Sequence, residues 1–182
     1  MTDPAEAARA VLHFWFNELS KEQHFRRDAD VDRHIAERFG KAREAVLKER
    51  AAGWRDEPET LLAAIILLDQ FSRNIFRGSA KAFEGDKLAL ELAKIAMERG
   101  WVELAPKERQ QFYLMPLMHS ENLADQDRSV AEFRRLGDEQ LEFAHLHHDQ
   151  VKRFGRFPGR NRALGRVSTA EERAFIAKDE TF

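Results

Sequence analysis

Apolar residues recur at intervals of three and four along most of the chain, which is the spacing of one face of an α-helix. One such stripe consists of Val31, Ile35, Phe39, Ala42 and Val46. A longer stripe consists of Phe112, Met115, His119, Leu123, Gln126, Val130 and Phe133, and a third of Leu141, Ala144, His148, Val151 and Phe154. β-Branched residues never alternate with polar residues over a useful length. The pattern therefore predicts an all-α fold.

Prolines and glycines indicate where these helices begin and end. Proline suits the first turn of a helix, so helices are predicted to open at Pro4, Pro58 and Pro106. Glycine is typical of the residue after a helix, which predicts helix ends near Gly53, Gly78, Gly100, Gly137 and Gly155. Pro116 lies inside a stripe and predicts a break or kink there. Ser168 with Glu171 three residues later predicts a capping box before a short terminal helix.

The length and composition suit one folded domain. The chain has 182 residues, of which 43% are hydrophobic and 34% are charged. No segment rich in Pro, Gly or Ser divides it into parts. We predict a single all-helical domain over residues 1–182, built as a compact array of antiparallel helix pairs, with a basic loop at residues 152–167.

Composition also excludes several classes of site and partner. The chain has no Cys, which excludes disulfides, zinc–thiolate sites, iron–sulfur clusters and thiol catalysis. The longest wholly apolar run spans residues 61–68, far short of the ~20 residues that a membrane-spanning helix needs. A net charge of −2 disfavours nucleic acid and anionic membranes as partners. The N-terminus lacks the features of a signal peptide, which predicts a cytoplasmic location.

A first polar cluster begins at Asp69. This residue follows Ile65 by four positions, so helical geometry places its carboxylate on or beside the buried face. A buried carboxylate needs a partner, and Arg73 lies one turn later, with Arg77 continuing the row. One interpretation is a structural ion pair that locks this helix against a neighbour. The other is a polar site to which Asn74 also belongs.

A second cluster surrounds His119, which falls on an apolar stripe although its side chain is polar. A half-buried imidazole in this position suits a general base, a ligand-binding group or a hydrogen-bonded core histidine. Glu121 points elsewhere if the helix is regular. A His119–Glu121 dyad therefore needs the distortion that Pro116 supplies.

A third cluster contains several histidines near residue 145, and we predict no metal and no cofactor from it. Glu142 and His145 form a single Glu-x-x-His pair, whereas di-iron helical bundles use two such pairs and two further glutamates. His145 and His148 share a helix face, but no third ligand is evident in the sequence. Packing or solvated histidines are the alternative interpretation.

The most distinctive segment is residues 152–166, which contain six basic residues and no acidic residue. Three glycines and a proline make it irregular, so its arginines can converge instead of fanning around a helix. Guanidinium forks suit carboxylates and phosphates. One hypothesis is an anion site formed by Arg156, Arg160 and Asn161. The other is an internal clamp that ties the loop to acids such as Asp69.

Three of these segments together resemble a bacterial family, domain of unknown function 924. The segments are Leu-Asp-Gln-Phe-x-Arg-Asn-x-Phe-Arg-Gly at residues 68–78, Met-Pro-x-x-His-Ser-Glu at residues 115–121, and Phe-Gly-Arg-Phe-Pro-x-Arg-Asn at residues 154–161. The resemblance implies an all-helical fold related to tetratricopeptide-type (TPR-like) helix pairs, and it implies no established activity. Gly159 stands where the family usually has His, so no mechanism is expected here that needs this His as a base or metal ligand.

We predict a cytoplasmic, TPR-like protein with an arginine-lined pocket for a small anionic ligand. Its lining is predicted to be Asp69, Arg73, Asn74, Arg77, His119, Glu121, Arg156, Arg160 and Asn161. One alternative is a hydrolase that uses His119 as base and Glu121 to orient it. Another is a protein-interaction module, because arrays of helix pairs often present concave surfaces to protein partners.

Overall fold

The computed structural model describes residues 3–178, and within this range every regular element is helical. The all-α prediction is therefore confirmed. The chain folds into two compact units. The first holds the described residues up to Arg77 together with Lys81–Leu104, and the second holds Gly78–Ala80 together with the described residues from Ala105 onward. The single-domain organisation and the TPR-like arrangement stay predictions.

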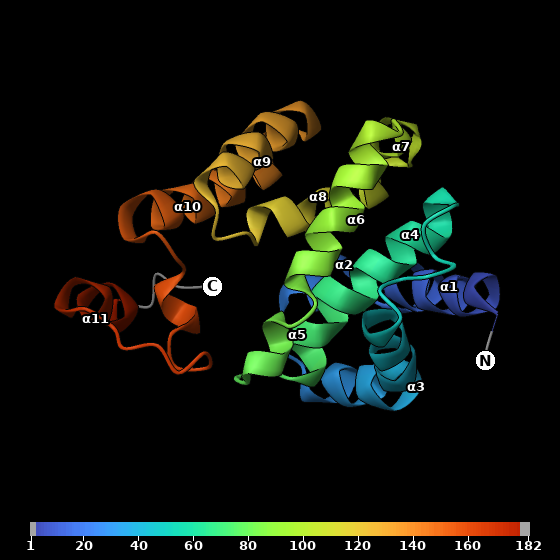
Figure 1. The fold of residues 1–182 in the computed structure, drawn as a ribbon, viewed down its shortest axis with the longest axis horizontal. Helices are drawn as coiled ribbons and strands as arrows, with labels where there is room; N and C mark the ends of the chain where they lie inside the picture. The colour runs from blue at the N-terminus through green and yellow to red at the C-terminus, as the bar shows by residue number, and fades with distance from the viewer. Residues whose placement is uncertain (1–2, 179–182) are drawn as a thin grey trace. The chain divides into compact units, whose positions relative to one another are not determined.

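The first unit is built around one long, interrupted helix. Its elements are α1 (Pro4–His13), the π-helix η1 (Phe14–Glu18), α2 (Lys21–Phe25), α3 (Ala29–Lys48), α4 (Pro58–Ile65), the π-helix η2 (Ile66–Phe71), α5 (Ser72–Ile75), α6 (Asp86–Glu98) and α7 (Trp101–Leu104) (Figure 1). A 3₁₀ turn, η3 (Ala80–Phe83), leads into α6. α1 and α6 pack against α4, while α3 packs against η2 and α5. The segment α4–η2–α5 is thus the central element of this unit.

The apolar run at residues 61–68 is buried throughout because helices surround α4 and η2. A cluster of aromatic rings packs beside this apolar run. Phe71 contacts Phe14, Trp15 and Phe39, with ring centroids 5.1–6.1 Å apart. A π-helical turn in such a position re-aims the side chains that follow it, and such turns are frequent at functional sites.

The second unit consists of α8 (Lys107–Met118), α9 (Leu123–Leu136), α10 (Asp138–Phe154), the 3₁₀ turn η4 (Pro158–Arg160) and α11 (Ala170–Ala177). α9 packs against both α8 and α10. α8 ends two residues after Pro116, which confirms the predicted break. Gly155 adopts φ 70° after α10, as expected for a left-handed helix terminus.

Two predicted helix boundaries were wrong. α3 ends at Lys48, before Gly53, because Arg50 and Ala51 adopt positive φ angles that a helix does not allow. The capping box belongs to Thr169 and Glu172, whose side chains each accept the backbone N–H of the other residue. Ser168 accepts a hydrogen bond from Asn161 instead.

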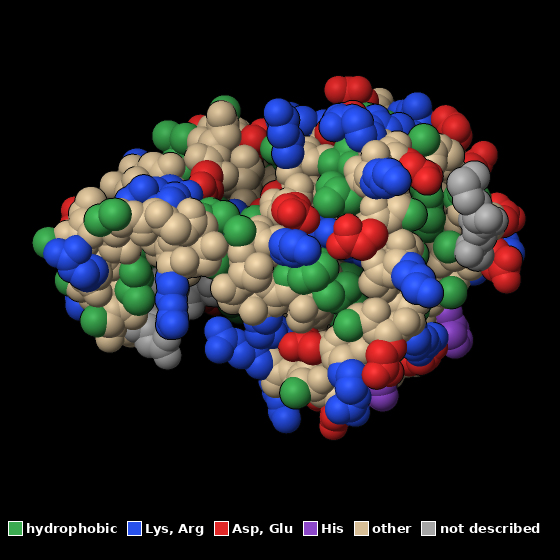
Figure 2. All heavy atoms as spheres, turned by 60° about the horizontal axis from the view of Figure 1, so that its bottom comes forward, with side chains coloured by type: hydrophobic (Ala, Val, Ile, Leu, Met, Phe, Trp, Pro, Cys, Tyr) green, Lys and Arg blue, Asp and Glu red, His purple; other side chains and the backbone are tan. Residues whose placement is uncertain are grey.

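The surface is strongly charged. Lys, Arg, Asp and Glu side chains are interspersed over the face that Figure 2 shows. Within residues 3–178, no helix combines the length and the apolar character needed to cross a membrane.

Candidate functional site

Asp69 lies in the π-helix η2, and its side chain is fully buried and paired, as the sequence predicted. The Arg73 guanidinium nitrogen lies 3.2 Å from Asp69 Oδ1 and donates a hydrogen bond to the Asp69 carbonyl oxygen. The Gln70 amide donates to Asp69 Oδ2 at 2.6 Å. The buried carboxylate therefore has the hydrogen-bonding partners that burial requires.

Arg73 has a second acidic partner that the sequence did not indicate. Both terminal nitrogens of Arg73 donate to the Asp86 carboxylate, at 2.8 and 3.0 Å. Burial lowers the pKa of Arg73, but the charges of Asp69 and Asp86 outweigh this effect and raise it overall. Asp86 stands in the first turn of α6, where acids are favoured. Its position in the sequence gave no sign that it would face Arg73.

The next two predicted site residues converge on one carboxylate. Asp32, in the first turn of α3, accepts hydrogen bonds from the Asn74 amide at 2.7 Å and from the Arg77 fork at 2.8 Å for both nitrogens. Arg73 and Arg77 thus each have a carboxylate partner inside the first unit. This arrangement fits the interpretation in which the Asp69 row locks its helix against neighbouring helices.

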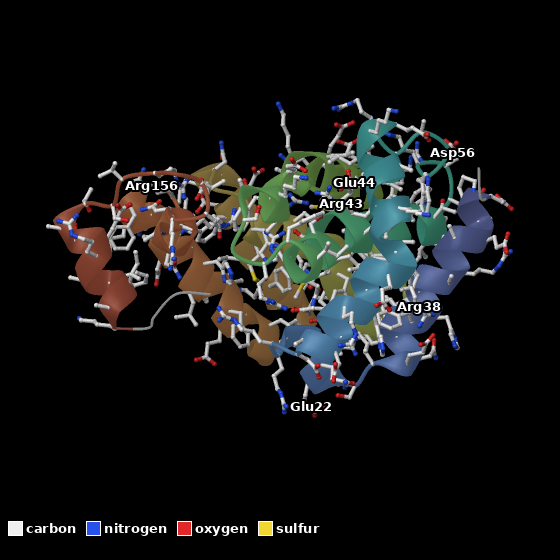
Figure 3. The ribbon with its side chains drawn as sticks, turned by 90° about the horizontal axis from the view of Figure 1, so that it is seen from below. Glu22, Arg38, Arg43, Glu44, Asp56 and Arg156 are labelled. Atoms are coloured by element: carbon white, nitrogen blue, oxygen red, sulfur yellow. The ribbon has the colours of Figure 1, made fainter. Side chains whose placement is uncertain are left out.

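The first unit also contains a buried arginine that was not among the predicted site residues. The Arg43 side chain is fully buried, and it donates to Ser72 Oγ at 2.9 Å and to the Lys81 carbonyl oxygen at 3.1 Å. Its neighbour Glu44 accepts a further bond at 2.9 Å (Figure 3). Arg43 lies four residues after Phe39 and three before Val46. A charged residue at this helical spacing from two apolar residues was the sequence signal that could have identified it as buried.

In the second unit, a pair of histidines lies at the end of α8. His119 is the residue that follows α8, and its ring centroid lies 5.9 Å from that of His147 in α10. The Phe143 carbonyl oxygen lies 2.8 Å from His147 Nδ1. Because a carbonyl only accepts, Nδ1 carries the hydrogen, and Nε2 is the basic nitrogen of the neutral ring.

The apolar stripe of α10 contained His148, but the neighbouring His147 is the more deeply buried of the two. The structure buries His147, while His148 is half-buried and lies 3.0 Å from the exposed Asp127. The helical period fits either residue equally well beside Ala144 and Val151. Packing against Phe157, whose ring centroid lies 5.5 Å from that of His147, decides between them.

Glu121 is bound to the C-terminal segment. Its carboxylate accepts the Arg166 fork at 2.7 and 2.9 Å and the Phe157 backbone N–H at 2.8 Å. Burial raises the pKa of Glu121, but the hydrogen bonds from Arg166 and Phe157 and the charges of Arg166 and Arg160 together outweigh burial, so the pKa lies below its usual value. Glu121 is therefore ionised at neutral pH. The His119–Glu121 dyad stays a prediction.

A second fork in the same segment joins Arg156 to Glu172. The two side chains form hydrogen bonds of 2.7 and 2.9 Å, and Arg156 is labelled in Figure 3. The Asn161 amide donates to Ser168 and to Glu172, at 3.0 and 3.3 Å. The Arg156 hydrogen bond is the main cause that lowers the pKa of Glu172 to about 2. These contacts fit the clamp hypothesis, with Glu172 as the acid.

Arg160, in the same segment, contacts a backbone carbonyl oxygen and an aromatic ring. One terminal nitrogen donates to the His119 carbonyl oxygen at 2.9 Å, and the guanidinium carbon lies 4.4 Å from the centre of the Phe157 ring. Arg160 thus joins the C-terminal segment to the end of α8. The structure brings His119, His147, Phe157 and Arg160 together in one cluster, which we call the His119 cluster.

The predicted site residues thus belong to two groups, one in each unit. Asp69, Arg73, Asn74 and Arg77 belong to the first unit, and His119, Glu121, Arg156, Arg160 and Asn161 belong to the second. Their convergence on a single pocket stays a prediction. Among the described residues, no three His, Asp or Glu side chains gather closely enough to hold a metal ion.

Comparisons with known proteins agree with the fold. The sequence pattern of a family described as "Bacterial protein of unknown function (DUF924)" matches residues 11–180. A solved structure of a protein of unknown function from Agrobacterium tumefaciens is similar to the chain, with 37% sequence identity and a TM-score of 0.92. The match covers 97% of this chain and 99% of that protein. Among curated proteins, none matches.

Proposed function

From the premise that the chain belongs to the DUF924 family of bacterial proteins, whose function is unknown, we propose that it binds a small anionic ligand. The site is the His119 cluster of the second unit. Arg160 supplies the positive charge, and His119 and His147 supply neighbouring hydrogen-bonding groups. The ligand carries an oxyanion, either phosphate or carboxylate.

The observation that carries this proposal is the geometry of Arg160. Its guanidinium lies over the Phe157 ring and is held by the His119 carbonyl oxygen, so its plane is ordered before a ligand arrives. An ordered guanidinium loses little conformational freedom on binding, and its planar fork suits carboxylate and phosphate oxygens. Such preorganisation favours affinity.

The charge of the surrounding segment supports the same proposal. Residues 152–166 contain six basic side chains. The structure pairs Arg153 with Glu171, Arg156 with Glu172 and Arg166 with Glu121. The segment itself contains no acidic residue, so its own charge is positive and favours anions.

A screen by thermal shift with inorganic phosphate, sugar phosphates, nucleotides and dicarboxylates tests the proposal. At least one of these anions should raise the melting temperature of the wild-type protein. Calorimetry on that anion should then show affinity about tenfold or more weaker in Arg160→Gln, because a charge-assisted hydrogen bond contributes about 1.5–3 kcal/mol.

Arg153→Gln is the matched control for this experiment. It removes the same charge from the same segment, but its partner is the exposed Glu171, so the affinity should change by no more than about twofold. An equal loss of affinity in both variants would indicate general electrostatic attraction and would contradict a site at Arg160. Absence of any anion that stabilises the wild type would refute the proposal.

The His119–His147 pair favours a second function, hydrolysis, because two neighbouring imidazoles can share the roles of general base and general acid. In this proposal His119 acts as the base, as the sequence suggested, and His147 replaces Glu121 as its neighbour. The test is turnover of chromogenic phosphate and carboxylate esters by wild type, His119→Gln and His147→Gln. A wild-type rate no higher than that of both variants would contradict it.

A further inference from the structure

We infer that Glu121 and Arg166 are positioning residues that hold the backbone of Phe157 and thereby place Arg160 for anion binding. This inference rests on the proposed function for its purpose, but its geometry is independent of any ligand. Arg166 has no place among the site residues that the sequence predicted.

The backbone of Phe157 is held on both of its polar groups. Its N–H donates to Glu121 Oε1 at 2.8 Å, and its carbonyl oxygen accepts from a terminal nitrogen of Arg166 at 3.0 Å. The same Arg166 fork binds both oxygens of Glu121. The ion pair and the peptide groups of one residue therefore form a closed ring of charge-assisted hydrogen bonds.

This ring of hydrogen bonds fixes the backbone from which the Arg160 side chain extends. Phe157 is the residue before the 3₁₀ turn η4, and its carbonyl oxygen also accepts the Arg160 N–H at 3.1 Å. Arg166 Nε donates to Asn161 Oδ1 at 2.9 Å, which holds the residue after the turn. Both ends of the turn that carries Arg160 are thus fixed to one guanidinium.

Fixing the turn also fixes the aromatic surface under the Arg160 guanidinium. The Phe157 side chain is buried and contacts both the His147 ring and the Arg160 guanidinium. A shift of the Phe157 backbone would therefore displace Arg160 relative to both histidines. Glu121 acts through Phe157, so its ionised carboxylate serves to hold the loop.

Amide hydrogen exchange followed by NMR tests the positioning role directly. Arg166→Lys keeps the positive charge beside Glu121, but a single ammonium cannot reproduce the planar fork. The Phe157 N–H should exchange at least about tenfold faster in Arg166→Lys and in Glu121→Gln than in wild type. The amide of the buried Phe133 in α9 is the internal reference for global opening, and its rate should change by less than about twofold.

Arg153→Lys provides the matched control. It makes the same replacement at an arginine whose partner is Glu171 in α11, so it should leave the exchange rate of the Phe157 N–H unchanged. Equal acceleration of the Phe157 and Phe133 amides in Arg166→Lys would indicate general loosening and would overturn the inference. An unchanged Phe157 rate would overturn it as well.

The link to binding uses inorganic phosphate as the probe. If phosphate binds the wild type, Arg166→Lys should weaken the affinity for phosphate at least about tenfold, and Arg153→Lys should leave this affinity unchanged. Retention of wild-type phosphate affinity despite faster Phe157 exchange would overturn the functional part of the inference. If phosphate does not bind the wild type and no other anion does, the proposed function fails, while the exchange rates still decide whether Glu121 and Arg166 hold Phe157.

Discussion

The carbonyl oxygen of Leu68 lies 2.5 Å from the position that a β-carbon would take on Gly85. Leu68 belongs to the π-helix η2, and Gly85 directly precedes α6. The φ angle of Gly85 is −80°, which any residue adopts easily. Glycine is therefore required here for close approach between two backbones. This approach places Asp86, the next residue, against Arg73.

Gly85→Ala should destabilise the protein by about 1–3 kcal/mol, because the new methyl group meets a backbone atom that cannot rotate away. Gly40→Ala is the control, since Gly40 lies inside α3 and a β-carbon there meets nothing within 4 Å. It should stabilise by roughly 0.5–1 kcal/mol. Urea unfolding measures both changes. Stabilisation by Gly85→Ala would show that η2 and α6 separate easily.

Arg43→Met should lower the free energy of unfolding by at least about 2 kcal/mol. The buried Ser72 hydroxyl and the part-buried Lys81 carbonyl each lose a hydrogen-bond donor, and an unpaired buried group costs about 1–3 kcal/mol. Arg33→Ala, on the same helix, removes an exposed pair with Asp30 and should change stability by less than about 0.5 kcal/mol. Denaturant unfolding compares the two. Similar effects of both substitutions would mean that the burial of Arg43 does not increase its contribution to the free energy of unfolding.

Asp69→Asn and Asp86→Asn should be non-additive. Each single variant leaves Arg73 with one of its two carboxylates, whereas the double variant removes both from a largely buried guanidinium. The double variant should therefore lose about 0.5–3 kcal/mol more than the sum of the single losses. A double-mutant cycle by urea unfolding measures this coupling, and additive losses would show that Arg73 does not depend on the two acids jointly.

Glu172 should contribute a pH-dependent component of stability. Its pKa falls from 4.5 to about 2 on folding, so the unfolded chain binds the proton more readily. This stabilisation is fully present above pH 4.5 and is lost as the pH falls toward about 2. Wild type should therefore melt above Glu172→Gln at neutral pH, and the difference should shrink through that window.

Glu171→Gln controls for the removal of a neighbouring carboxylate, because its pair with Arg153 is exposed. Its melting temperature should stay close to that of wild type at every pH. A difference between wild type and Glu172→Gln that does not change with pH would show that the carboxylate charge is not what holds α11.

The sequence by itself determined the helical class, most helix boundaries and the burial of Asp69. These features depend on local chemistry. The three-and-four spacing exists within each helix, proline and glycine act on their own backbone, and a carboxylate four residues after Ile65 must share its face. The same local reasoning assigned the capping box to Ser168 instead of Thr169, because neighbouring hydroxyl residues suit the capping role equally well.

Only the tertiary structure decided which charges pair across long separations in the sequence. Asp32 meets Arg77 across 45 positions, and Glu121 meets Arg166 across the same separation. No local pattern distinguishes these acids from the many others on the chain. Likewise, His147 is more deeply buried than His148 because the ring of Phe157, in the C-terminal segment, packs against it. Long-range partners depend on how helices pack, and packing is set by the shapes of all the side chains together, which spacing along one helix does not encode.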